Sequence, residues 1–432
     1  MILLLAALAD AADVPELSLA DAVRMVVERN PDRESAVLAE SIAQIDAHRA
    51  RLDRATLALG VSGDGAAGVQ KPWNEDTIGV ASADWDARAR LTVPLYAGGA
   101  IQASIDRADA ASRIATTDRT ITERQLVRAA YTAYWTIRGY ELQIAATEEG
   151  LALTQEGLDI ISAKAKAGLA AGIDVNRSTV ELYAQQDALV SEKSELYQSQ
   201  QDLIRLLHLQ GDAVVLTDVA PEPASGAVAL PENAGEKRPE LQRKDDEAAA
   251  AEAAIRAARS ATLPSVSVFA TAGAGGASAG PTDDSAFGAF TADDLRPALD
   301  ASAGLQLSWN VFDLGKTHDS VAAAKLAAAQ VDASALAEKD SIAADIRQAA
   351  ARVRELRERV PLSDKQVALA RDNLQIVRDL YAQGSATVLE LFDAQSAFRS
   401  ASTQGASLRV QLATAECDLR WLLGDDPLGA PR

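Results

Sequence analysis

The chain has 432 residues, of which 48% are hydrophobic but only 4% aromatic, and its formal net charge is −20 at pH 7. This composition argues against a nucleic-acid-binding protein, because phosphate contacts need clustered Lys and Arg, and the basic residues here are interspersed with acids. The abundance of Ala, Leu, Glu, Arg and Gln predicts long helices.

The first residues resemble the end of a secretory signal peptide. Residues 1–9 are apolar, and Ala7 and Ala9 occupy the small-residue positions of a cleavage site. The usual basic segment does not precede them, so we interpret this run as a truncated signal, with a short helix cap as the alternative. The sequence contains no run of about 18 apolar residues, so no helix is expected to cross a bilayer.

The sequence repeats itself at an offset of half its length. Residues 91–96 match residues 307–312, and Gly168 matches Gly384 at the same offset. Such a duplication predicts two structurally similar halves. We expect the following division: a first repeat at 17–210, a connector at 211–237, a second repeat at 238–424 and a tail at 425–432.

Each repeat opens with a helical pattern. In the first repeat Ser18 is placed to cap the helix, and Asp21 lies three residues on, near the positive end of the helix dipole. Asn30 and Pro31 interrupt this pattern, which resumes to about residue 56. In the second repeat a helix is expected from Pro239 to about residue 261.

A strand hairpin follows each of these helices, at residues 57–96 and 263–312. Around Trp85 and Leu91 charged and apolar residues alternate, which predicts a strand with one charged and one apolar face, and the second copy continues this alternation to Val311. The polar loops are expected at 69–82 and 280–299.

Two strands per repeat make too little sheet to be stable alone. Closure into a barrel across subunits would satisfy every strand edge, whereas a soluble sheet covered by helices is the alternative.

The longest elements come next, as helices at 100–167 and 317–382. Apolar residues recur in steps of four and three from Leu126 in the first helix and from Ile342 in the second, which is the period of a coiled coil. A helix of that length is on the order of 100 Å long at about 1.5 Å per residue. Pro361 predicts a kink or a local break in the second helix. Short turns then lead to return helices at 174–209 and 388–423.

The order and duplication of these elements resemble the TolC-type outer-membrane efflux proteins, over nearly the whole chain. The resemblance implies an α+β membrane protein: a homotrimer whose subunits each give four strands to one twelve-stranded β-barrel, continued by a periplasmic α-helical tube. It also implies a location in the cell outer membrane, in contact with outer-membrane lipid and extending into the periplasm. The implied function is a duct that exports small molecules such as drugs with an inner-membrane pump and a periplasmic adaptor protein.

The resemblance also assigns roles to residues near the helix turns. Four turn residues match the place where the family docks its adaptor, namely Gly168, Leu169, Gly384 and Ser385. Four further residues match its channel gate, namely Asp174, Tyr381, Glu390 and Asp393. The sequence departs from the family at Ala386, where some members carry an arginine that locks the gate.

A ring of three Glu390 and three Asp393 side chains would concentrate negative potential in a narrow mouth, would select cations and could bind a divalent ion. The alternative is that acids in the first turn of a return helix only complement its dipole.

The residues offer no catalytic chemistry, so no enzyme, cofactor or dedicated metal site is expected. The three His lie in different elements and the single Cys417 has no partner. Two other functions stay open: the same duct could serve type I protein secretion, or the chain could be a soluble coiled-coil scaffold.

Overall fold

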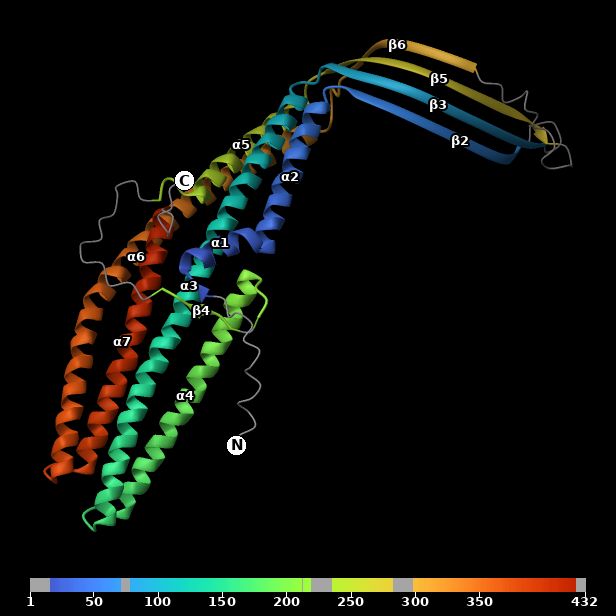
Figure 1. Ribbon diagram of the computed structural model, residues 1–432. Coiled ribbons are helices and arrows are strands. Elements are labelled where there is room, and N and C mark those ends of the chain that lie inside the picture. The colour runs from blue at the N-terminus through green and yellow to red at the C-terminus, as the bar shows by residue number, and fades with distance from the viewer. Residues whose placement is uncertain (1–15, 71–77, 212, 219–234, 283–297, 425–432) are drawn as a thin grey trace. The chain divides into compact units, whose positions relative to one another are not determined.

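The structure is a computed structural model that describes residues 16–70, 78–211, 213–218, 235–282 and 298–424 (Figure 1). The predicted signal segment 1–9 and the tail 425–432 lie outside the described residues, as does most of the connector. The chain forms two compact units: residues 1–38, 117–242 and 336–432 make the first, and residues 39–116 and 243–335 make the second. Each unit therefore takes pieces from both sequence repeats.

Helices account for most of the chain. Their bounds are α1 Leu19–Arg29, α2 Pro31–Leu52, α3 Ala100–Lys166, α4 Gly172–Leu207, α5 Pro239–Ser260, α6 Lys316–Gln383 and α7 Val388–Leu423. The long helices α3 and α6 begin and end within one residue of the bounds that the sequence predicts. The return helices α4 and α7 likewise begin and end within two residues of the predicted bounds.

The two predicted coiled-coil seams form the interior of the first unit. Every seam position from Leu126 to Ile161 in α3 and from Ile342 to Tyr381 in α6 is buried or half-buried. Near the turns, Ile161 packs in one apolar cluster with Leu374 of α6 and Phe398 of α7. The period of 3.5 thus places one continuous apolar stripe of each long helix against its neighbours.

The start of α1 is fixed by its cap. The Ser18 hydroxyl accepts a hydrogen bond from the Asp21 backbone N–H at 3.1 Å, as the sequence predicts. Residues 16–17 form a short strand, β1, that pairs in parallel with β4, residues 215–216. Asn30 ends α1, and Pro31 takes the first position of α2, where its missing N–H costs nothing.

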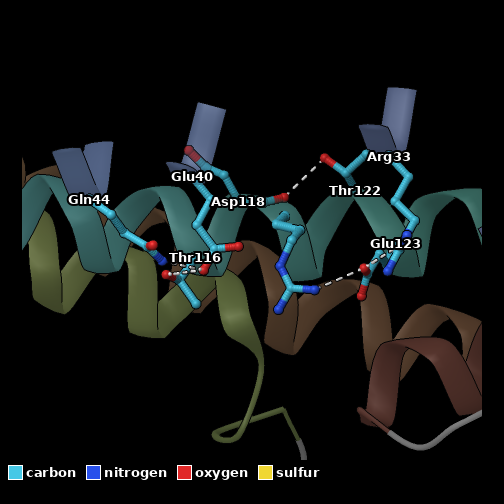
Figure 2. Close-up of polar contacts among 8 residues, drawn as sticks. Arg33, Glu40, Gln44, Thr116, Asp118, Thr122 and Glu123 are labelled. Atoms are coloured by element: carbon cyan, nitrogen blue, oxygen red, sulfur yellow. Dashed lines mark hydrogen bonds and ion pairs between the residues drawn. The ribbon is translucent and has the colours of Figure 1, made fainter. Parts of the chain in front are cut away.

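Polar contacts link α2 to α3 within each unit (Figure 2). In the first unit the Arg33 guanidinium donates to Glu123 at 2.9 Å. In the second unit the Thr116 hydroxyl donates to Glu40 at 2.9 Å, and the same carboxylate accepts from Gln44. These contacts hold the two helices together along their partly exposed faces.

The second unit contains one antiparallel sheet of four strands in the order β2-β3-β5-β6 (Figure 1). The strands are β2 Thr56–Gln70, β3 Ile78–Tyr96, β5 Ser265–Thr282 and β6 Ala298–Ser308. Both predicted hairpins are therefore present, and pairing of β3 with β5 joins them into one sheet. The duplication thus yields a sheet in which each repeat supplies one half.

The bounds of all four strands differ from the sequence prediction. All four strands extend into the segments predicted as loops at 69–82 and 280–299, because hydrogen bonding to a neighbouring strand offsets the low strand preference of the small residues there. β6 ends at Ser308, so Trp309 and Val311 lie beyond the strand. Residues 71–77 and 283–297, the centres of both predicted loops, lie outside the described residues.

Of the kink or local break predicted at Pro361, the break does not occur. α6 runs unbroken from Lys316 to Gln383 with Pro361 inside it. Its neighbours Val360 and Ser363 are buried, so packing holds this turn in helical form although the proline removes one backbone donor.

Candidate functional site

Two nearly identical turns end the long helices. Gly168 and Gly384 both adopt a positive φ, of 74° and 83°. In the first turn the Leu169 N–H donates to the Lys164 carbonyl, and in the second the Ser385 N–H donates to the Leu380 carbonyl, both at 2.8 Å. This is the Schellman arrangement, in which a glycine at the left-handed position lets the last helical carbonyls find donors. The predicted docking residues therefore form two matched turns, each with an exposed tip.

The return helices begin differently after these turns. α7 starts with a capping box: the Thr387 hydroxyl accepts from the Glu390 N–H at 3.3 Å, and the Glu390 carboxylate accepts from the Thr387 N–H at 2.6 Å. The N-cap residue of α4 is Ala171, whose side chain cannot accept a capping hydrogen bond. The pattern Thr-x-x-Glu in the sequence signals this capping box.

The capping role affects the proposed gate acid Glu390. The hydrogen bond from the Thr387 backbone, followed by that from its hydroxyl, lowers the pKa of Glu390, which is fully exposed. Its carboxylate is therefore engaged at its own helix end, as the alternative interpretation of these acids expects. Asp393 is also exposed, about one turn further along α7.

Tyr381 lies in the last turn of α6 and is only 5% exposed. The Lys164 ammonium group is 4.3 Å from the centre of its ring and donates to the Tyr381 carbonyl. Burial, followed by the negative charge of Asp174, raises the pKa of Tyr381. The structure thus brings Tyr381 near Asp174 and away from solvent, whereas Glu390 and Asp393 are exposed.

Sequence reasoning missed the polar contacts that join the two helix hairpins. Arg371 of α6 pairs with Glu149 of α3 at 2.8 Å, and Arg378 pairs with Glu156 one heptad further along both helices. We call these two pairs, with the Lys164–Tyr381 contact below them, the α3–α6 ladder. The heptad spacing of the four charged residues is the one sequence feature that could have indicated it.

The sheet of the second unit has two chemically different faces. On one face the register aligns apolar residues of all four strands: Leu57 opposite Leu91, Leu91 opposite Ala270, and Ala270 opposite Ala303. The large side chains on this face are exposed, and they include Leu57, Leu59, Val61, Leu305 and Leu307.

The other face is polar. It carries Asp86, Arg88, Thr271 and Ser302, with an ion pair of 2.8 Å between Arg88 and Asp86. Within the described residues, β2 and β6 are the two ends of the strand order and pair on one side only. A row of free backbone donors and acceptors is therefore left on both edges.

In the described part of the chain, no helix is long and apolar enough to cross a membrane. In the same residues no three His, Cys, Asp or Glu side chains gather closely enough to hold a metal ion.

Comparisons with known proteins give the family. The model of the outer membrane efflux protein family matches residues 23–208 and 230–425, which is most of the chain, so the chain belongs to this family. Members of this family are outer-membrane channels that extend into the periplasm, not enzymes. The predicted family, the outer-membrane location and the non-enzymatic class are therefore confirmed.

Two curated relatives from Pseudomonas putida are 28% identical to this chain over 247 residues: the antibiotic efflux pump outer membrane protein ArpC and the toluene efflux pump outer membrane protein TtgC. The alignment covers 53% of this chain and 49% of each relative, so the chain spans about half the length of the curated relatives it matches.

Solved structures support the fold. CusC superimposes with a TM-score of 0.80 at 17% identity, covering 96% of this chain and 93% of that one. The outer membrane protein VceC of Vibrio cholerae gives a TM-score of 0.75 at 15% identity, covering 94% of this chain and 96% of that one. The predicted combination of duplicated strand hairpins with long coiled-coil helices is confirmed at the level of fold.

Proposed function

We propose that three copies of this chain form an outer-membrane duct that passively conducts small toxic molecules, such as drugs, to the exterior. An inner-membrane pump would supply the molecules, and a periplasmic adaptor protein would join pump and duct. The observation that carries this proposal is the four-stranded sheet, with one exposed apolar face, one polar face and two unpaired edges.

The two edges of such a sheet can both be hydrogen-bonded within lipid only when the sheet closes into a ring. Every backbone polar group in a bilayer must be paired, so the β2 edge of one copy needs the β6 edge of the next. Three copies of four strands give twelve, which closes a barrel with its apolar face towards lipid and its polar face towards a water-filled lumen. The number of copies comes from the family.

The helix turns supply the docking and gate residues of the proposed duct. The exposed turn residues Gly168, Leu169, Gly384 and Ser385 dock the adaptor. Exposed Glu390 and Asp393 line the narrow mouth, where a ring of six carboxylates favours cations. Asp174 and Tyr381 act in the same gate from within the packed helices, since the negative charge of Asp174 acts on the buried Tyr381.

The named cargoes of the relatives favour small molecules. ArpC is named for antibiotics and TtgC for toluene, whereas protein cargo through the same duct is the second candidate. A soluble scaffold is disfavoured by the exposed apolar face of the sheet, which would be an aggregation site in water.

Two matched variants test the proposal. Leu305 lies on the apolar face and is 71% exposed, and its sequence neighbour Gln306 lies on the polar face. We expect Leu305→Arg to reduce the amount of chain in the outer-membrane fraction, because an arginine facing lipid costs about 2–4 kcal/mol near the bilayer midplane. Gln306→Arg should insert normally.

A dye assay tests export. Cells that lack the gene should accumulate a fluorescent efflux dye, and the wild-type chain and Gln306→Arg should both reverse this. Equal insertion of both variants, or a wild-type chain found in the soluble fraction, would refute the proposal.

A further inference from the structure

The apolar interior between α6 and α7 is interrupted at one level. Towards the turns, Phe398 of α7 packs in the apolar cluster that contains Leu374 of α6. Further from the turns, Leu408 of α7 packs in a second apolar cluster with Val360 of α6. The buried residues of α6 and α7 between the two clusters are all small, namely Ser363, Ser402, Gly405 and Ala406. One layer of large side chains is therefore missing from this seam.

The missing layer leaves a cavity in the first unit. Its volume is about 260 Å³, and it lies among three helices. Its apolar lining includes Leu142 and Ala146 of α3, Val367 of α6 and Ala406 of α7. An apolar cavity of about 150 Å³ in a protein core can hold benzene. The space here is therefore sufficient for a small aromatic molecule.

Two buried hydroxyl groups at this level lack a hydrogen-bond partner among the described residues. Ser402 lines the cavity and is 8% exposed, and its Oγ atom is unpaired. The Oγ atom of buried Ser363 is unpaired as well, and it would lie 3.3 Å from a Cβ added at Gly405, which also lines the cavity. A buried hydroxyl without a partner costs free energy, so an occupant that bonds to it would stabilise the fold.

The charged side chains that line the cavity balance one another. Arg371 pairs with Glu149 at 2.8 Å, and Arg409 pairs with Asp364 at 2.9 Å. All four side chains are about half exposed, whereas Ser402 is buried. Two positive and two negative charges leave no net charge that would attract an ion. The lining therefore favours an uncharged occupant.

We propose that this cavity binds a small uncharged aromatic molecule that carries one hydroxyl group, such as a phenol. Its ring would pack against the apolar lining, and its hydroxyl would bond to Ser402. The site lies within one copy of the chain, so it goes beyond the proposed duct and does not depend on how many copies assemble. The bound molecule would fill the missing layer and hold α3, α6 and α7 together.

The sequence duplication argues that the small residues are not a requirement of the hairpin itself. At the offset between the two repeats, Gly405 and Ala406 of α7 correspond to Leu189 and Val190 of α4. The two return helices have the same length of 36 residues. The α6–α7 hairpin thus has space at positions where the α3–α4 hairpin carries two larger apolar side chains.

Thermal unfolding of the detergent-purified protein with phenol and with toluene tests the site. The two compounds have nearly the same shape, but toluene has a methyl group in place of the hydroxyl group. We expect phenol to raise the thermal midpoint of the wild type by about 1–2 °C at about ten times its Kd, because a ligand of the folded state stabilises it by mass action. Toluene should raise the midpoint less, since it leaves the Ser402 hydroxyl unpaired.

Two variants of lining residues locate the effect. Ser402→Ala removes the hydroxyl, so phenol and toluene should then give equal shifts. Ala406→Leu fills part of the cavity, so neither compound should raise the midpoint. Ser400→Ala is the matched control, because Ser400 lies on the same helix but is exposed and outside the cavity lining. It should respond to both compounds as the wild type does.

The responses of these proteins decide the inference. It is overturned if the wild type does not respond to phenol, if phenol and toluene shift the wild type equally, or if the phenol effect survives in either lining variant. Ser402→Ala removes a single atom, so it decides the question even if Ala406→Leu does not fold. The native mass of the same samples tests the proposed duct separately. A trimer without the predicted responses contradicts only the inference, and a monomer with them contradicts only the duct.

Discussion

At the residue scale, Gly168 and Gly384 are fixed by backbone geometry and not by crowding. A Cβ at either position would meet no atom within 4 Å, but the positive φ is costly for any other residue. We expect Gly384→Ala to lower stability by about 1–2 kcal/mol, measured by thermal unfolding in detergent. Gly172→Ala is the control, because Gly172 is exposed, has an ordinary φ and has equal space around it. If both variants unfold alike, the Schellman geometry is not what requires the glycine.

Glu390 should make the start of α7 sensitive to pH. Hydrogen bonds from Thr387 lower the pKa of Glu390 in the folded chain. A group with a lowered folded pKa stabilises the fold above its unfolded pKa, which is about 4.3 for Glu, and loses that effect as the pH falls through the folded value. The thermal midpoint of Glu390→Gln should therefore lie below that of the wild type at pH 7, and the difference should shrink towards pH 3. A difference that does not change with pH would contradict this assignment.

Some of these residue roles could be read from the sequence and some could not. The two turn glycines and the cap at Ser18 follow from local patterns, because each depends on residues adjacent in the chain. Lys164 over Tyr381 and the pairing of Arg371 with Glu149 were not predicted, since their partners lie in the other half of the chain and the heptad spacing of the charged residues does not say which helices meet. Their geometry depends on how the two hairpins pack, which no local pattern encodes.

At the element scale, the α3–α6 ladder should couple the two helix hairpins weakly. Glu149 and Arg371 are about half exposed, so solvent screens the pair. A double-mutant cycle of Glu149→Ala and Arg371→Ala should give a coupling of about 0.2–1 kcal/mol that decreases with added salt. The exposed pair Arg205 and Asp202, one turn apart on α4, is a control that joins no two helices. Hairpins joined only by apolar packing would show no coupling between Glu149 and Arg371.

Pro361 marks a place where packing overrides local preference. The sequence predicts a kink or a local break, yet α6 continues unbroken because Val360 and Ser363 on either side are buried in the seam. Pro361→Ala should therefore raise the thermal midpoint, since an interior proline costs about 3 kcal/mol in a helix. Pro31→Ala should change it little, because Pro31 occupies the first position of α2. A lower midpoint for Pro361→Ala would mean that the proline serves the packing of α6.

At the scale of the whole molecule, the sequence predicted the helices and the two strand hairpins well, but not how the two hairpins pair with each other. The spacing of apolar residues indicated the long helices and their seams. The heptad spacing of a coiled-coil helix differs from the two-residue alternation of a strand, so the two patterns can be told apart in one sequence. The pairing of β3 with β5 and the length of β5 were not predicted, because small residues such as those around Gly275 have little strand preference of their own. The free edges of β2 and β6 could not be read from the sequence of one chain either, because they concern contacts between copies.

The unpaired surfaces of one chain bear on how copies of the chain assemble. A chain whose sheet has two unpaired edges has unpaired backbone groups on both sides, and the proposed closed ring would pair them. In the proposed trimer, the acidic residues Glu390 and Asp393 of three copies would meet in one mouth. In a single chain both carboxylates are exposed and Glu390 caps its own helix, so a selective function for them rests on the proposed assembly.

Planar-bilayer conductance tests this account most directly. Detergent-purified wild-type protein should be recorded beside the double variant Glu390→Ala with Asp393→Ala. We expect a small cation-selective conductance from the wild type, and a larger or less selective conductance from the variant, because removal of the acidic ring removes both the constriction and its potential. No conductance from folded, membrane-inserted wild-type protein would contradict the duct itself, and identical traces from the two proteins would contradict its acidic gate.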